Sequence, residues 1–160
     1  MRVTVTTQYR FVQTDDGAIW TPADFPYSFW TRYLDVFSEV EIIGRTELRK
    51  KPPIGAIRVD GPGVVVRSLP YFIGPRQYFS NLRATRSVLR EASRRVDAAI
   101  LRIPCHIAWL WSQELQFRNC PFAVEMVGDP WDILSSKVLQ HRSSLLCSRE
   151  AASFDYCSVI

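Results

Sequence analysis

The stretch "DAAILRIPCHIAWLWSQELQF", residues 97–117, decides the fold because a short apolar run passes through a proline into an amphipathic segment. Residues 97–104 predict a strand, and residues 105–117 predict a helix. The residues that the helix directs inward are Ile107, Leu110, Trp111 and Leu115. A strand followed directly by a helix is the repeating unit of a parallel sheet.

The same alternation extends along the chain in both directions from this unit. Strands are predicted at 2–7, 39–45, 63–69, 97–104 and 121–127, and helices at 25–37, 78–96 and 105–117. The run Val64–Val66 indicates a strand that is buried on both faces. The sequence therefore predicts one α/β domain over residues 1–133, Rossmann-like, with a mostly parallel sheet and helices on both faces.

The end of the chain differs in composition from this domain. Residues 134–160 hold seven serines and only fragments of a helical pattern. We expect a poorly ordered or helical tail there, with the look of a truncated end, and little loss of stability on its deletion.

Composition and charge limit the classes of partner and the cellular compartment that we expect. The net charge of +4 and the pI near 9.0 favour an anionic partner without choosing one. The four cysteines form no C-x-x-C pair and the two histidines have no zinc spacing, so we expect reduced thiols, no metal site and no cofactor. The polar start and the lack of an apolar run near about 18 residues predict a cytoplasmic protein, at most peripheral at the inner face of a membrane.

Polar side chains follow the predicted strands, where ligands bind in an open parallel sheet. Those placed at this edge as candidate acceptor-binding residues are Asp16, Arg45, Arg102, His106, Asp129 and Trp131. Asp129 and His106 are the weak candidates for a catalytic role. The concentration of these six candidate residues along one edge of the sheet predicts a pocket there.

Each of these residues also has a purely structural interpretation. Asp129 could position an acceptor hydroxyl, act as a general base or cap the next turn, and Trp131 could stack on a sugar or plug the sheet edge. His106 suits the first turn of a helix as well as a ligand. Arg102 ends a buried strand and needs a partner for its charge, either an acidic or phosphorylated ligand or Asp129.

The sequence contains no phosphate-binding loop, dinucleotide fingerprint, nucleophile elbow or zinc-protease motif. A stripe of arginines on the predicted helix 78–96 is most simply a solvated face, and its alternative is contact with anionic lipid. The stripe is Arg83, Arg86, Arg90 and Arg94. Nucleic acid is not the expected partner, because residues 81–96 contain no aromatic side chain to interleave with the arginines.

Three pieces in this order resemble the N-terminal, acceptor-side half of GT-B glycosyltransferases of the group-1, family-four-like type that build capsule or exopolysaccharide. They are "FWTRYLDVFSEVEIIGR", "DAAILRIP" and "PFAVEMVGDPWD". The resemblance covers about residues 1–133 and implies transfer of a sugar from a nucleotide-sugar to a glycan or lipid-linked acceptor. It also implies that the donor is held by a C-terminal domain that this chain lacks, so the chain alone should be inactive.

This chain departs from the family pattern at two places. Glu39 and Glu47 have the Glu-x(7)-Glu spacing of the donor motif, but they bracket a strand in the acceptor half, so we interpret the match as accidental. The loop after the first strand has one glycine and two aspartates where the family often has a glycine-rich phosphate loop. The alternative function is a non-catalytic interaction module whose basic helix face binds an anionic surface or partner.

Overall fold

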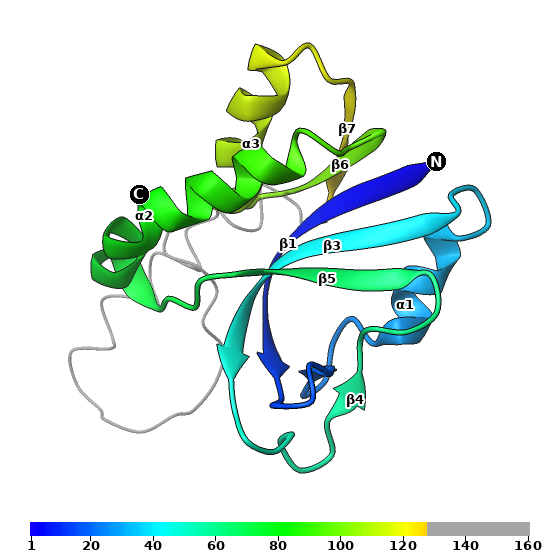
Figure 1. Ribbon diagram of the computed structural model, residues 1–160, viewed down its shortest axis with the longest axis vertical. Coiled ribbons are helices and arrows are strands. Elements are labelled where there is room, and N and C mark those ends of the chain that lie inside the picture. Colours follow the sequence, from blue (N-terminus) through cyan, green and yellow to red (C-terminus); the bar gives the residue numbers. More distant parts are fainter. Residues whose placement is uncertain (128–160) are drawn as a thin grey trace, which may run out of the picture. The chain divides into compact units, whose positions relative to one another are not determined.

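The computed structural model describes residues 1–127, which form an α/β domain with a seven-stranded sheet (Figure 1). The strands are β1 (Arg2–Gln13), β2 (Ile19–Thr21), β3 (Glu39–Leu48), β4 (Ile57–Arg58), β5 (Val64–Leu69), β6 (Ala98–Ile103) and β7 (Phe122–Met126). The helices are α1 (Tyr27–Trp30), the 3-10 turn η1 (Thr31–Tyr33), α2 (Gly74–Ala92) and α3 (His106–Phe117).

The central strands β5, β3, β1, β6 and β7 lie side by side in this order, and every neighbouring pair among them is parallel. Numbered along the chain, these five strands have the order 3-2-1-4-5, which is that of a Rossmann sheet. The short strand β2 pairs antiparallel with the carboxyl end of β1, and β4 pairs antiparallel with β2. The predicted fold class is confirmed.

Two apolar clusters cover the two faces of the sheet. On one face α2 and α3 pack over Ala99 and Leu101, with the indole of Trp111 fully buried. On the other face Trp30 of α1 packs with Val3, Val5 and their neighbours. Successive strand residues point to opposite faces, so the same strands supply both clusters.

The predicted helix at 25–37 is wrong in extent, because only α1 and η1 form there. The backbone of Phe25 has a φ of 60°, and its carbonyl accepts the indole N–H of Trp30 at 2.9 Å. The aromatic residues in this segment stack on one another and on the sheet. Tertiary packing of these rings has overridden the helical spacing that the sequence shows.

The predicted first strand, 2–7, is too short, because β1 continues to Gln13 after a break in its pairing with β3 between Thr6 and Arg10. Residues 8–13, expected in a loop after this strand, therefore lie within it, whereas Asp15, Asp16 and Gly17 form the turn that follows. The ring of Phe11 comes so close to Gly44 that an added Cβ would lie 2.7 Å from its Cε2 atom. Glycine at this position lets β3 follow the irregular course of β1.

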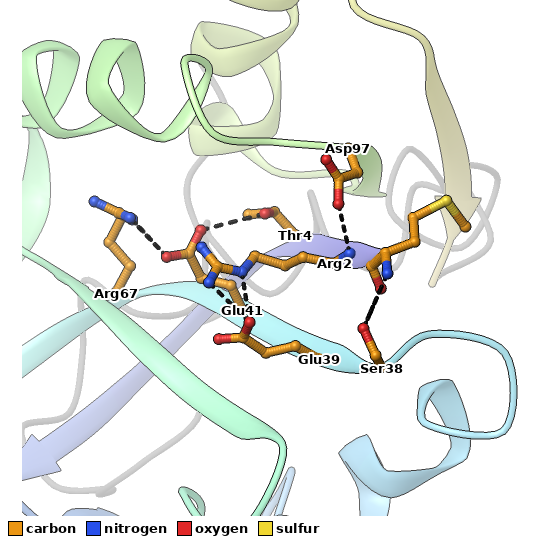
Figure 2. A network of polar contacts seen from close by, with 8 residues as sticks. Arg2, Thr4, Ser38, Glu39, Glu41, Arg67 and Asp97 are labelled. Atoms are coloured by element: carbon orange, nitrogen blue, oxygen red, sulfur yellow. Dashed lines mark hydrogen bonds and ion pairs between the residues drawn. The ribbon is translucent and has the colours of Figure 1, made fainter.

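A network of charged side chains ties together the amino ends of β1, β3 and β5 (Figure 2). Glu41 is 5% exposed, accepts a hydrogen bond from the hydroxyl of Thr4 and forms an ion pair with Arg67 at 2.7 Å. Arg2 pairs with Glu39 at 2.7 Å, and its backbone N–H donates to Asp97. The carboxylates at this edge thus have partners within the protein, whereas Arg45 and Arg102 lie toward the carboxyl ends of their strands.

Candidate functional site at the switch point of the sheet

The topological switch point of the sheet lies where β1 and β6 separate. Their regular pairing ends at Val5 and Ile100, and the backbone N–H of Arg102 donates instead to the hydroxyl of Thr6 at 3.1 Å. The strand order reverses at this point, since the chain turns from β1 toward β3 on one side and from β6 toward β7 on the other. In sheets of this type, ligands bind outside the carboxyl ends of the strands at this switch point.

Arg45 organises the polar groups near this switch point. Its guanidinium donates to the carbonyl of Phe72 at 3.0 Å and to the carbonyl of Gln8. It also lies 4.7 Å from the centre of the Phe72 ring. The ring of His106 packs 5.6 Å from the same ring and 4.9 Å from that of Tyr78. The structure thus brings together two predicted site residues, Arg45 and His106.

His106 is the first residue of α3, as the sequence interpretation allowed. Burial and then the positive charge of Arg45 lower the pKa of His106 from 6.5 to about 4, so the ring is neutral at pH 7. Its Nε2 atom is buried and has no hydrogen-bond partner among residues 1–127, and the same holds for Oε1 of Gln8. A buried polar atom without a partner costs free energy that a ligand can recover.

These two atoms can bind a hydroxyl group but are poorly suited to moving its proton. A neutral imidazole nitrogen either accepts or donates a hydrogen bond, and a hydroxyl group can match both. With a pKa about three units below neutrality, His106 takes up a proton weakly at pH 7. The arrangement therefore favours orientation of a hydroxyl-bearing ligand over general-base catalysis by His106.

The pKa of His106 predicts a pH effect on stability. Between pH 6.5 and about 4 the unfolded chain binds more protons at this residue than the folded chain, so the free energy of unfolding falls as the pH falls. For this half-buried ring, screened by solvent, the loss should be about 1–2 kcal/mol. Urea unfolding of the protein and of His106→Gln at pH 7 and pH 4 measures it. The variant should lose less stability on acidification, and identical losses would contradict the assignment.

Arg102, expected to need a partner, has one within the sheet. It is 7% exposed and lies opposite Glu125 of β7 in the parallel register. The two charges approach to 3.2 Å between Nε and Oε2, with the geometry of an ion pair rather than of a hydrogen bond. Its guanidinium also lies over the rings of Phe25 and Phe29, at 4.7 and 5.1 Å from their centres.

Glu125 is the residue at this edge that the sequence interpretation missed. It accepts hydrogen bonds from Arg32 at 3.0 Å and from the hydroxyl of Tyr33 at 2.9 Å, besides pairing with Arg102. Burial, together with the carboxylate of Glu125, raises the pKa of the Tyr33 hydroxyl. A single carboxylate inside the apolar run 121–127 was the available signal, since a buried charge requires a partner.

The remaining predicted site residues lie elsewhere or outside the described range. Asp16 accepts hydrogen bonds from Thr14 and from the backbone of Ala18 within its own turn, and these lower its pKa. Asp129 and Trp131 lie outside the described residues, as does the predicted tail at 134–160. The possible pairing of Arg102 with Asp129 is therefore a prediction that stays open, although Glu125 already supplies a counter-charge.

The four arginines of the stripe are exposed, as predicted for a solvated face, but α2 ends at Ala92, so Arg94 lies just beyond it and the predicted helix 78–96 is too long at this end. Arg90 forms an ion pair with Glu114 at 3.3 Å, and Arg94 forms one with Glu91 at 3.2 Å. For Arg83 and Arg86, no ion pair is found within residues 1–127. Contact of this stripe with an anionic surface stays a prediction.

Residues 1–127 contain neither a candidate membrane span nor a candidate metal cluster. None of the helices there is both long and apolar enough to cross a bilayer. Within the same part of the chain, no three histidine, cysteine, aspartate or glutamate side chains gather in a way that could hold a metal ion. Glu39 and Glu47, the pair with the donor-motif spacing, both lie on β3 and pair with Arg2 and Arg49.

The strand order defines a Rossmann-like α/β domain, and the unpartnered polar atoms near its switch point make this edge of the sheet a candidate small-molecule site. No protein-family model and no curated protein matches this chain. Among solved structures, the C-terminal domain of a hydrogenase from Pyrococcus furiosus aligns with a TM-score of 0.42 and 13% identity, over 78% of this chain and 91% of that domain. Neither the fold assignment nor any function rests on a likeness of this size.

Proposed function

We propose that the carboxyl edge of the sheet, at the switch point between β1 and β6, binds a sugar hydroxyl, and that the chain is the acceptor-side domain of a glycosyltransferase. The observation that carries the proposal is that two buried atoms, His106 Nε2 and Gln8 Oε1, have no partner among residues 1–127. Arg45 links their two residues, because it donates to the backbone carbonyl of Gln8 and its charge acts on the His106 ring. Sugars present several hydroxyl groups, each able to donate and accept. A site with unpartnered acceptors discriminates strongly in favour of ligands that supply the missing hydrogen bonds.

The ligand is proposed to be a glycan or a lipid-linked sugar, and the donor a nucleotide-sugar held by a second domain. The resemblance of the sequence to GT-B enzymes supports this choice, as does the Rossmann strand order. No glycine-rich phosphate loop follows β1, whose residues 8–13 continue the strand. Catalysis would depend on positioning the acceptor when two domains close, so the 160-residue chain alone should not transfer sugar.

The proposal predicts that acceptor sugars bind more tightly than nucleotide-sugars. Oligosaccharides and UDP-, GDP- and ADP-sugars should be titrated by calorimetry, with the donors expected to bind in the millimolar range, about −4 kcal/mol. His106→Ala and Gln8→Ala should each weaken acceptor binding about two- to tenfold through a lost hydrogen bond.

Gln113→Ala is the matched control, because this glutamine is exposed on α3. It should leave acceptor binding unchanged. Micromolar binding of a nucleotide-sugar that is lost in His106→Ala would contradict the assignment to the acceptor side. Acceptor binding that is unaffected by both site substitutions would contradict the location.

A further inference from the structure

The loop between β3 and β4 carries apolar side chains directly into solvent. Leu48 and Ile57 at its two ends are 77% and 49% exposed, and Ile54 at its tip is 105% exposed. The backbone N–H of Ala56 donates to the carbonyl of Pro53 at 3.1 Å, and Gly55 has a φ of 73°, as a type II turn requires. The turn therefore holds Ile54 outward, where it contributes nothing to the core.

Positive charge surrounds this apolar tip. The segment 48–58, "LRKKPPIGAIR", has four basic residues and no aspartate or glutamate. Arg49 and Arg58 pair with carboxylates just outside the segment, Glu47 and Asp60. Lys50 and Lys51 are exposed, and neither forms an ion pair within residues 1–127. The loop thus combines an exposed isoleucine with two lysines whose charge is not compensated nearby.

We propose that the loop 49–56 is a docking site for an anionic lipid bilayer. Ile54, with Leu48 and Ile57 behind it, enters the boundary between headgroups and acyl chains, while Lys50 and Lys51 contact the lipid phosphates. Apolar side chains bind this boundary in proportion to their buried area, and each basic side chain adds electrostatic attraction to anionic lipid.

Other occupants suit this surface less well. A stable protein interface needs about 800 Å² on each partner, and one turn with three apolar side chains is small for that purpose. A nucleic acid would be expected to meet aromatic rings on which its bases stack, and the segment 48–58 has none. Complementarity of charge and the narrow apolar tip together favour a bilayer.

The inference does not depend on the function proposed for the candidate site at the switch point. It also concerns a different surface from the arginine stripe of α2, where Arg90 and Arg94 are already paired. The loop follows the carboxyl end of β3, and the candidate site also lies toward the carboxyl ends of the parallel strands. Docking through the loop would therefore serve an acceptor that is itself held in the membrane.

Co-sedimentation with vesicles tests the proposal on the full 160-residue chain. Vesicles of phosphatidylcholine with phosphatidylglycerol should retain the protein, and vesicles of phosphatidylcholine alone should retain far less. Ile54→Ser should lower the partition coefficient about tenfold. Lys50→Glu with Lys51→Glu should lower it at least about 25-fold. Because all three side chains are exposed, the near-UV circular dichroism of the variants should match that of the unchanged protein.

Arg83→Glu with Arg86→Glu is the control of equal charge change, made on the exposed face of α2. It should lower the partition coefficient by no more than about threefold, through the weakened overall field of the protein. A larger loss in this control than in the lysine variant would overturn the proposal and assign docking to α2. Equal retention by neutral and anionic vesicles, or full binding by Ile54→Ser, would also overturn it.

Discussion

Replacing Glu125 with alanine is expected to lower the free energy of unfolding by about 3 kcal/mol. The substitution removes the carboxylate that faces Arg102, whose guanidinium is then enclosed by Phe25 and Phe29 with its charge uncompensated. Arg32 and Tyr33 lose the same partner, but Arg32 is half exposed and can turn to water. Urea unfolding at pH 7 measures the change.

Two further variants separate this cause from a general weakening of β7. Glu114→Ala also removes a carboxylate from an arginine, but its partner Arg90 is 56% exposed, so the loss should stay below about 1 kcal/mol. Adding Arg102→Met to Glu125→Ala should recover most of the stability, since methionine fits an aromatic environment without a charge. If the double variant is less stable than Glu125→Ala alone, the buried charge is not the cause.

Trp111→Ala is expected to cost about 4 kcal/mol, the largest effect of any single substitution considered for this domain. Trp111 is fully buried between α2 and α3, and its indole N–H donates to the carbonyl of Leu89 at 3.1 Å and to the hydroxyl of Ser93 at 2.9 Å. Alanine would leave a cavity under both helices and remove the indole donor, although the carbonyl of Leu89 keeps its hydrogen bonds from Ser93. Thermal and urea unfolding measure the loss.

Trp111→Phe keeps most of the volume and removes the hydrogen bonds, so it should cost about 1–2 kcal/mol beyond the small loss of contacts. Trp109, on the same helix but 59% exposed, is the matched control, and Trp109→Ala should change stability by less than about 1 kcal/mol. Equal losses at the two tryptophans would contradict the packing of α3 against α2 described above.

The sequence predicts the fold because its strongest signals are local and repeated. The runs at 63–69 and 97–104 are apolar and rich in β-branched or alanine residues, and each is followed by a helical pattern. Each predicts its element independently, and the alternation of strands and helices leaves few topologies open. Five parallel strands follow from this alternation, and the structure has them.

Structural features that depend on contacts between distant residues could not be predicted from local sequence patterns. The helical spacing at 25–37 belongs to aromatic residues that pack around Arg102, so the spacing did not produce a long helix. The extension of β1 beyond Thr6 depends on renewed pairing of Arg10 with Arg45 on β3. Strands of two or three residues, such as β4 and β2, carry too few positions to show a period.

The candidate site was predicted in part. Listing polar residues after each strand found Arg45 and His106, which the structure places around Phe72. It also included Asp16, which bonds within its own turn, because the true length of β1 was unknown. The partner of Arg102 depends on the register in which β6 and β7 pair, and the sequence of neither strand predicts that register.

Ring-nitrogen NMR of the chain is the most direct test, because the proposed site depends on His106 as a neutral, half-buried ring whose buried Nε2 binds a ligand hydroxyl. The protein has two histidines, so His106→Gln assigns the signals. The account predicts that the His106 ring titrates near pH 4 and that its Nε2 signal shifts when an acceptor oligosaccharide is added at pH 7. A His106 ring that titrates near pH 6.5, with a signal unmoved by every sugar tested, would contradict the account.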